Sequence, residues 1–181
     1  MKRLIAVTLG VLLLTGCATT AKSTGAVKTG LGNKVSIASS TSATADKSGN
    51  AQVDTVMAAV SFDANGKILT VKIDNAQTKV EFDAKGAIKS DLKAEPKTKV
   101  ELGKDYGMVK QSKIGKEWFE QIAALEKWMV GKTVDQVKAM KVKKVDDNHP
   151  SVPDEADLKS SVTISVQDYV AAVEEAFKNA K

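Results

Sequence analysis

One stretch decides the fold: QVDTVMAAVSF at Gln52–Phe62, then DANG at Asp63–Gly66, then KILTVKI at Lys67–Ile73. In the first part every second residue from Val56 is apolar, namely Val56, Ala58, Val60 and Phe62, and these residues would share one face of a strand. This alternation predicts a strand with one buried side, and the third part alternates in the same way. The Asn-Gly pair between them favours a tight hairpin turn, because both central residues can adopt positive φ.

The segments on either side extend this hairpin into a larger sheet. Lys34–Ser39 alternates too and predicts a preceding strand. Downstream, the sequence of Phe62–Ile68 recurs in similar form at Phe82–Ile88. Two copies are too few for a solenoid, so we interpret them as two similar hairpins of one antiparallel meander. Asp63 and Asp83, which begin the two turns, are predicted to stabilise them through their side chains.

Helical periodicity replaces alternation in the second half of the chain. Apolar residues at helical spacing predict a helix over Ser112–Val130, with Gly131 as its stop. A capping box at Thr133–Gln136 predicts a short helix to about Met140. Ser165 is predicted to cap a last helix, whose apolar stripe is Val166, Tyr169, Val170, Val173 and Phe177. Strands first and helices after predict an α+β fold, an antiparallel β meander followed by three helices packed on the sheet.

The aromatic residues concentrate near the first long helix. Trp118 and Trp128 are predicted to be core residues where the helix covers the sheet. Phe119 lies off the main stripe and is the better candidate for an exposed ring. The alternative is that this group forms a stacking surface for a flat aromatic ligand such as a flavin or a quinone.

The composition excludes much of enzyme chemistry. The 181 residues include one cysteine, Cys17, and one histidine, His149. A multi-histidine metal site is therefore excluded, and a Ser-His-Asp arrangement would have a single candidate base. His149 lies in a polar loop beside Pro150, where a solvated role is expected.

The N-terminus has the pattern of an export signal. Met1-Lys2-Arg3 is basic, Leu4–Leu14 is apolar, and small Gly16 precedes Cys17. The apolar run is too short to span a bilayer permanently, and the pattern resembles the lipobox of bacterial lipoprotein signal peptides. We therefore expect residues 1–16 to be the signal peptide, 17–33 a lipidated flexible linker, and 34–181 a single α+β domain.

Lipidation at Cys17 would place the chain on the extracytoplasmic face of the cell membrane. Two fatty acyl chains, such as palmitate, anchor a protein stably where one chain is marginal. Removal of Lys2 and Arg3 lowers the formal charge from +5 to +3. The lysines that remain alternate with carboxylates, which is typical of a solubilising surface, so a nucleic-acid partner is not expected.

A segment near the C-terminus resembles a known family. Asp157–Ser165, followed by an alanine-rich helix, is similar to the signature of the FMN-binding domain family, whose members include exported flavoproteins of electron transfer. Asp157, Ser160 and Thr163 match the pattern, and the resemblance implies that a flavin transferase would join FMN through its phosphate to the Thr163 hydroxyl. A threonine before a helix N-terminus would also favour a negatively charged ester.

The match is degenerate, since the family's glycine and alanine are Ser161 and Val162 here. Lys104–Met108 and Gly115–Trp118 further resemble a branch of lipoproteins from anaerobic Gram-positive bacteria. The resemblance implies a flavin carrier in electron transfer, rather than an enzyme, with FMN held covalently or noncovalently and a redox partner. The alternative is a non-catalytic binding or assembly lipoprotein that keeps the fold without a cofactor. A hydrolase is a remote third hypothesis.

Overall fold

The structure is a computed structural model that describes residues 25–181, so the predicted signal peptide and Cys17 lie outside the described residues. Its main sheet has three antiparallel strands in the order β1-β2-β3: Lys28–Ser36, Gly49–Phe62 and Ile68–Phe82. The helices that follow are α1 (Lys99–Leu102), α2 (Trp118–Met129), α3 (Val134–Lys138) and α4 (Gln167–Lys178). Two short 3-10 helices cover Gly103–Tyr106 and Met108–Lys110, and a two-stranded sheet pairs β4 (Val142–Lys143) with β5 (Val152–Pro153).

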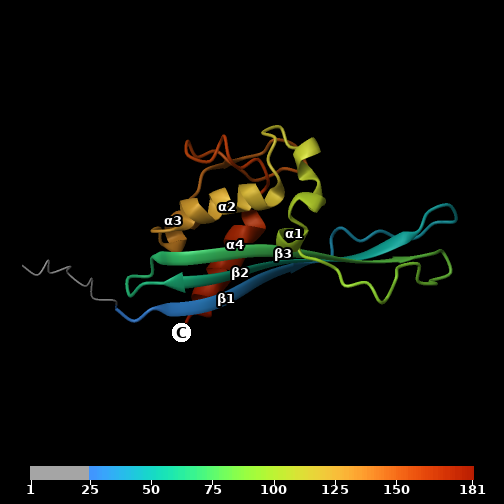
Figure 1. Ribbon diagram of the computed structural model, residues 1–181, viewed down its shortest axis with the longest axis horizontal. Coiled ribbons are helices and arrows are strands. Elements are labelled where there is room, and N and C mark those ends of the chain that lie inside the picture. Colours follow the sequence, from blue (N-terminus) through green and yellow to red (C-terminus); the bar gives the residue numbers. More distant parts are fainter. Residues whose placement is uncertain (1–24) are drawn as a thin grey trace, which may run out of the picture.

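The helices are arranged around the three-stranded sheet. Figure 1 shows α2 running along β3, while α4 crosses β2 and β1, and both helices contact those strands. The ends of β2 and β3 near Gly49 and Phe82 extend beyond the helices. The predicted α+β fold, a meander followed by helices that pack on it, is confirmed.

The repeated sequence motif forms two copies of one turn. In the β2–β3 turn, Asp63 Oδ1 accepts the backbone N–H groups of Asn65 at 2.8 Å and Lys67 at 2.9 Å. In the second turn, Asp83 Oδ1 accepts the equivalent N–H groups of Lys85 and Ala87, both at 2.9 Å. The prediction that these aspartates stabilise turns is confirmed. The second copy continues only as a single bridge between Phe82 and Ile88, so it is a shorter hairpin than the first.

The backbone of the first turn differs from the expectation. Gly66 has φ +75°, but no residue other than glycine has positive φ in the described chain, so Asn65 does not adopt it. The turn is therefore longer than two residues and has one left-handed residue, Gly66, which is a common alternative to the two-residue turn. The pairing of Ser61 with Thr70 and of Phe62 with Ile68 leaves Leu69 as an extra residue in β3. Because of this bulge, Leu69 does not point into the core, and it is 42% exposed.

The first strand begins earlier than the sequence indicated. β1 starts at Lys28, so the predicted flexible linker over 17–33 and the predicted strand start at Lys34 are wrong at this boundary. The misleading residues are Gly30 and Gly32, which are typical of linkers. Both lie beneath α4, where a Cβ atom would overlap the backbone of Ala176 or Ala172. These glycines are therefore part of the helix–sheet interface, because they let the two backbones approach closely.

Both edges of the sheet are occupied by groups from the helical half. On β1, Thr29 exchanges two backbone hydrogen bonds with Lys181, each 3.1 Å, and the Asn179 amide donates to Leu31 O at 3.0 Å. On β3, the Ile73 N–H donates to the Glu126 carboxylate at 2.8 Å. These contacts satisfy edge groups that would otherwise be open to pairing with another chain.

Two helix boundaries also require correction. The helix predicted over Ser112–Val130 begins only at Trp118, because Gly115 has φ +62° and the chain enters the helix through a capping box at Glu117. The last helix starts at Gln167 after Val166, and the predicted cap Ser165 instead accepts the Ser151 N–H at 3.3 Å. The predicted capping box of α3 at Thr133–Gln136 is confirmed.

The core forms where α2 and α4 meet the sheet. Trp118 is only 2% exposed, as predicted, and its indole N–H donates to the Tyr169 hydroxyl at 2.9 Å. Trp128 packs against the core only in part, with the Lys132 ammonium 4.2 Å from its ring centre. Phe177, predicted to be on the buried stripe, is 45% exposed but meets Phe62 edge to face at 5.1 Å.

Alkaline pH is expected to destabilise the protein through Tyr169. Burial raises the pKa of this phenol from 10.0 to about 12. In the unfolded chain the phenol ionises near pH 10, so between pH 10 and about 12 the unfolded state releases a proton that the folded state keeps. The stabilisation is complete below pH 10 and is lost as the pH rises toward 12. Urea unfolding below pH 10 and at about pH 11 should show a smaller pH-dependent loss for Tyr169→Phe than for the parent.

The comparison isolates Tyr169 because all other titrating groups are present in both proteins. At neutral pH, Tyr169→Phe should itself cost about 1 kcal/mol, since it removes the acceptor of the Trp118 N–H. An identical pH dependence in the two proteins would contradict the assignment.

Candidate functional site around Thr163

A pocket of about 280 Å³ opens between residues 108–113, 143–153 and 159–163, and Thr163 lies in its wall. We call it the Thr163 pocket. Its lining residues are Met108, Gln111, Ser112, Lys113, Lys143, Val145, Asp146, His149, Val152, Pro153, Lys159, Val162 and Thr163. Its volume is just below the ~300–1,000 Å³ typical of small-molecule sites, which suits part of a cofactor, such as a phosphate with its attached chain.

Thr163 is held by a side chain from α2. Gln121 is fully buried, and its Oε1 accepts the Thr163 N–H at 2.8 Å and the Thr163 hydroxyl at 3.3 Å. The Gln121 amide in turn donates to Ser112 Oγ and to Lys116 O, both at 3.3 Å. One buried amide therefore fixes two walls of the pocket relative to each other.

The wall opposite Thr163 is fixed by a buried carboxylate. Glu117 is only 4% exposed, and it accepts the N–H groups of Met108 at 2.8 Å and Val109 at 3.1 Å. Hydrogen bonds from backbone N–H groups satisfy a carboxylate that would otherwise be costly to bury. Because Glu117 also begins α2, the segment that carries Met108 and Lys113 is fastened to the same helix that holds Thr163.

The charged lining of the pocket is predominantly basic. Lys113, Lys143 and Lys159 line it, against Asp146 as the one acidic lining residue. Two of the lysines are oriented by Asp154, whose Oδ1 lies 3.1 Å from Lys159 Nζ and 3.2 Å from Lys143 Nζ. These hydrogen bonds, that from Lys159 first, lower the pKa of Asp154. Lys143 and Lys159 thus converge on Asp154 beside the pocket, and with Lys113 they give the lining an excess of positive charge that suits an anionic ligand.

His149 lies in a loop with 44% of its side chain exposed, as predicted, and it pairs with one carboxylate. Its Nδ1 lies 2.8 Å from Asp146 Oδ1, and Asp146 also accepts the N–H groups of Asn148 and His149. The hydrogen bond with the His149 ring lowers the pKa of Asp146. The imidazole lines the pocket beside the lysines.

The predicted cofactor residues separate into two groups. Thr163 lines the pocket, whereas Asp157 and Ser160 are exposed and do not line it. Of the two residues that depart from the family motif, Val162 is completely buried in the core. Its apolar side chain is therefore explained by packing.

The expected phosphate site at a helix N-terminus is not formed around Thr163. Helix α4 begins at Gln167, and the N–H groups of Thr163 and Val166 already donate to Gln121 and to Ser151 O. Positive charge near Thr163 comes from the lysines instead. Lys159 lies within the motif segment, whereas Lys113 and Lys143 come from other segments that only the tertiary fold brings to it.

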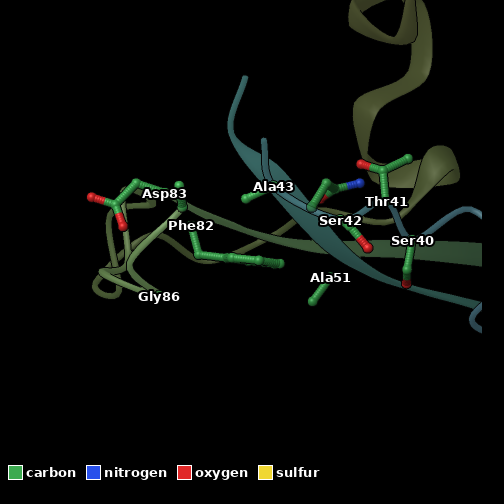
Figure 2. Close-up of a pocket in the computed structure, with 10 residues that line it drawn as sticks. Ser40, Thr41, Ser42, Ala43, Ala51, Phe82, Asp83 and Gly86 are labelled. Carbon is green, nitrogen blue, oxygen red and sulfur yellow. The ribbon is translucent and has the colours of Figure 1, made fainter. Parts of the chain in front are cut away.

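A second hollow, of about 520 Å³, lies at the far ends of β2 and β3. In Figure 2 the Phe82 ring extends toward Ala51, while Asp83 points to the opposite side. The remaining lining is mostly small, with Ser40, Thr41, Ser42 and Ala43 along one side. The Asp83 carboxylate is already used by the turn, so this shallow hollow offers few groups for chemistry.

Comparisons with known proteins assign no role to this site. No family model, no curated protein and no solved structure matches this chain. Within residues 25–181, no helix is long and apolar enough to cross a membrane. In the same part of the chain, no group of three or more histidine, cysteine or acidic side chains could hold a metal ion.

Proposed function

We propose that this chain is a lipid-anchored extracytoplasmic binding protein that carries FMN, with the flavin's phosphate in the Thr163 pocket. The observation that carries the proposal is that Thr163 and three lysines line one pocket. The motif match rests on Asp157, Ser160 and Thr163, and Lys113 and Lys143, which lie outside this motif, add support from the pocket.

The residues divide the task of binding as follows. Lys113, Lys143 and Lys159 would neutralise the phosphate, and the Ser112 hydroxyl would donate to it. Gln121 would keep Thr163 in place for a phosphoester or a hydrogen bond. The apolar side chains of Met108 and Val145 would contact the uncharged part of the ligand. When bound, the flavin would supply the electron-transfer chemistry, and the protein would supply position and electrostatics.

A titration with FMN and riboflavin tests the noncovalent form of this proposal. The two ligands differ only in the phosphate, so the protein should bind FMN at least about tenfold more tightly. Lys159→Ala should weaken FMN binding several-fold and leave riboflavin binding unchanged. Lys127→Ala, on the exposed side of α2, is the matched control and should change neither. Equal affinity for the two ligands would contradict the phosphate assignment, and no binding of either would favour the cofactor-free binding lipoprotein.

The covalent form is tested by mass spectrometry of protein matured in a host that contains a flavin transferase. Attachment at Thr163 should add FMN mass to the peptide that contains it. Thr163→Ser should keep the increment, since it keeps the hydroxyl, and Thr163→Val should abolish it. Persistence of the increment in Thr163→Val would place the attachment at another residue.

A further inference from the structure

One side of the main sheet carries exposed aliphatic side chains. The register aligns Leu31 with Ala59 and Lys72, and Val35 with Thr55 and Ala76, on the side opposite to the core. Three aliphatic residues here are far more exposed than core residues: Leu31 at 62%, Val35 at 54% and Ile37 at 69%. Val53 and Met57 continue the apolar surface on β2. We call this side of the sheet the open face.

An apolar groove of about 490 Å³ adjoins the open face where it meets the helices. Its floor includes Leu31, Met57 and Ala59, and its rim includes Val100 of α1 and Phe119 of α2. Phe119 is thus the partly exposed ring that the sequence indicated, but it lies outside the Thr163 pocket. The groove and the open face share Leu31, Met57 and Ala59, and the polar residues Asn33, Lys72 and Asp74 lie among these apolar side chains.

The described part of the chain has nothing left to cover this surface. Helix α4 packs on the other side of the sheet. It approaches Gly30 and Gly32, which pair with the core residues Val60 and Ala58. The groups that occupy the sheet edges come from α2, α4 and the C-terminal residues, and they leave the open face exposed. Several exposed aliphatic side chains gathered on one face of a sheet are typical of an interaction site.

The occupant is indicated by the connection to the anchor. Only ten residues, 18–27, separate Cys17 from β1, the strand that carries Leu31 and Val35. Covalent geometry limits their span to ~40 Å. If Cys17 is acylated, the open face starts within this distance of the bilayer. We propose that the open face and its groove are a membrane-contact surface that lies against the lipid bilayer; this proposal rests on the lipid anchor of the proposed function.

The size of the face also favours a bilayer over a second copy of the chain. Nine residues of β1 and three strands give an area of roughly 400 Å², from ~3.3 Å per residue and ~4.8 Å between strands. A stable dimer usually buries about 800 Å² on each partner. Membrane contact does not need that area, because the acyl anchor already supplies the affinity and the aliphatic side chains need only set the orientation. Lys72 on the same face has 84% of its side chain exposed, and its Nζ lies 3.0 Å from Glu126 Oε2, so contact with an anionic headgroup would compete with this ion pair.

A fluorescent reporter on the mature lipoprotein tests the contact. With Cys17 acylated, a cysteine introduced by Ala59→Cys would be the one free thiol, and Ala59 is exposed on the open face. Ala139→Cys, exposed at the end of α3 and remote from the open face, is the matched control. Both would carry the same environment-sensitive dye, in vesicles of phosphatidylcholine and phosphatidylglycerol with quencher-bearing lipid.

The expected result is at least about threefold stronger lipid quenching at position 59 than at position 139. Leu31→Ser combined with Ile37→Ser should reduce the quenching at position 59 without changing thermal stability, since both side chains are exposed. Equal quenching at the two positions would overturn the proposal. Shielding of position 59 that rises with protein concentration and not with lipid would assign the face to a second copy instead.

The mass of the N-terminal peptide separates this proposal from the one on which it rests. A peptide with the diacylglyceryl increment and an unquenched position 59 would refute the contact and keep the anchor. A peptide without the increment would refute the anchor. In that case vesicle binding by the unacylated chain, with lipid quenching at position 59, would still support the open face as a membrane-contact surface.

Discussion

Gly32→Ala is expected to destabilise this protein by about 3 kcal/mol, at the upper end of the cost of overpacking a core. A Cβ at this position would overlap the backbone of Ala172 and Ala176 in α4. Because the obstacle is backbone, shortening a side chain on the helix cannot relieve it. The helix must move away from β1, and the contacts of Val173 and Tyr169 with the core would weaken with it.

Chemical denaturation measures this effect directly. The free energy of unfolding should fall for Gly32→Ala, and similarly for Gly30→Ala, whose Cβ would overlap the Ala176 carbonyl. Lys34→Ala on the same strand is the matched control, because Lys34 is exposed and should change stability by less than about 0.5 kcal/mol. A Gly32→Ala protein as stable as the parent would show that α4 does not lie against β1 as described.

Gln121→Met is expected to damage both the stability and the candidate site. Methionine has nearly the same shape as glutamine, so packing is kept while every hydrogen bond of the amide is lost. The Thr163 N–H would then lose its 2.8 Å acceptor in a part-buried position, and Ser112 Oγ would lose one of its two donors. An unsatisfied buried group costs about 1–3 kcal/mol, so we expect a loss of roughly 2 kcal/mol.

Two measurements distinguish the two consequences. Denaturation gives the loss of stability, and the FMN titration should show weaker binding even where Gln121→Met remains folded. Gln167→Met, on the exposed first turn of α4, is the matched control and should change neither quantity. Normal FMN binding by a folded Gln121→Met protein would argue against a role for Gln121 in positioning Thr163.

The sheet was predictable because its signals are local. Alternation over Gln52–Phe62 and the paired Asp63 and Asp83 turns depend only on residues near in sequence. The start of β1 was not predictable in this way. Gly30 and Gly32 have the composition of a linker, and only the approach of α4, more than a hundred residues later, gives them a structural role.

The candidate site was predictable only at Thr163, where a short motif carries the signal. Its partners come from other segments. Gln121 lies on the buried face of α2, Lys113 lies in the turn before this helix, and Lys143 belongs to β4. A buried glutamine at helical spacing gives no sign of what it will contact. Lysines are also so numerous on this surface that no three of them stand out in the sequence.

The two proposed surfaces have different tasks. The Thr163 pocket has a polar and basic lining suited to an anionic cofactor, whereas the open face is aliphatic. No residue that lines the pocket also lines the groove on the open face. If both proposals hold, contact of the open face with the bilayer would leave the residues that line the Thr163 pocket free to bind FMN.

The most direct test of the central claim is an absorption spectrum of the mature protein, purified from its own host together with that host's maturation machinery. If the Thr163 pocket holds FMN, the parent protein should show flavin absorbance. This absorbance should be lost or strongly reduced when Lys113 and Lys159 are both replaced by alanine. A colourless parent protein, with no FMN mass on the Thr163 peptide and no FMN affinity in solution, would contradict it.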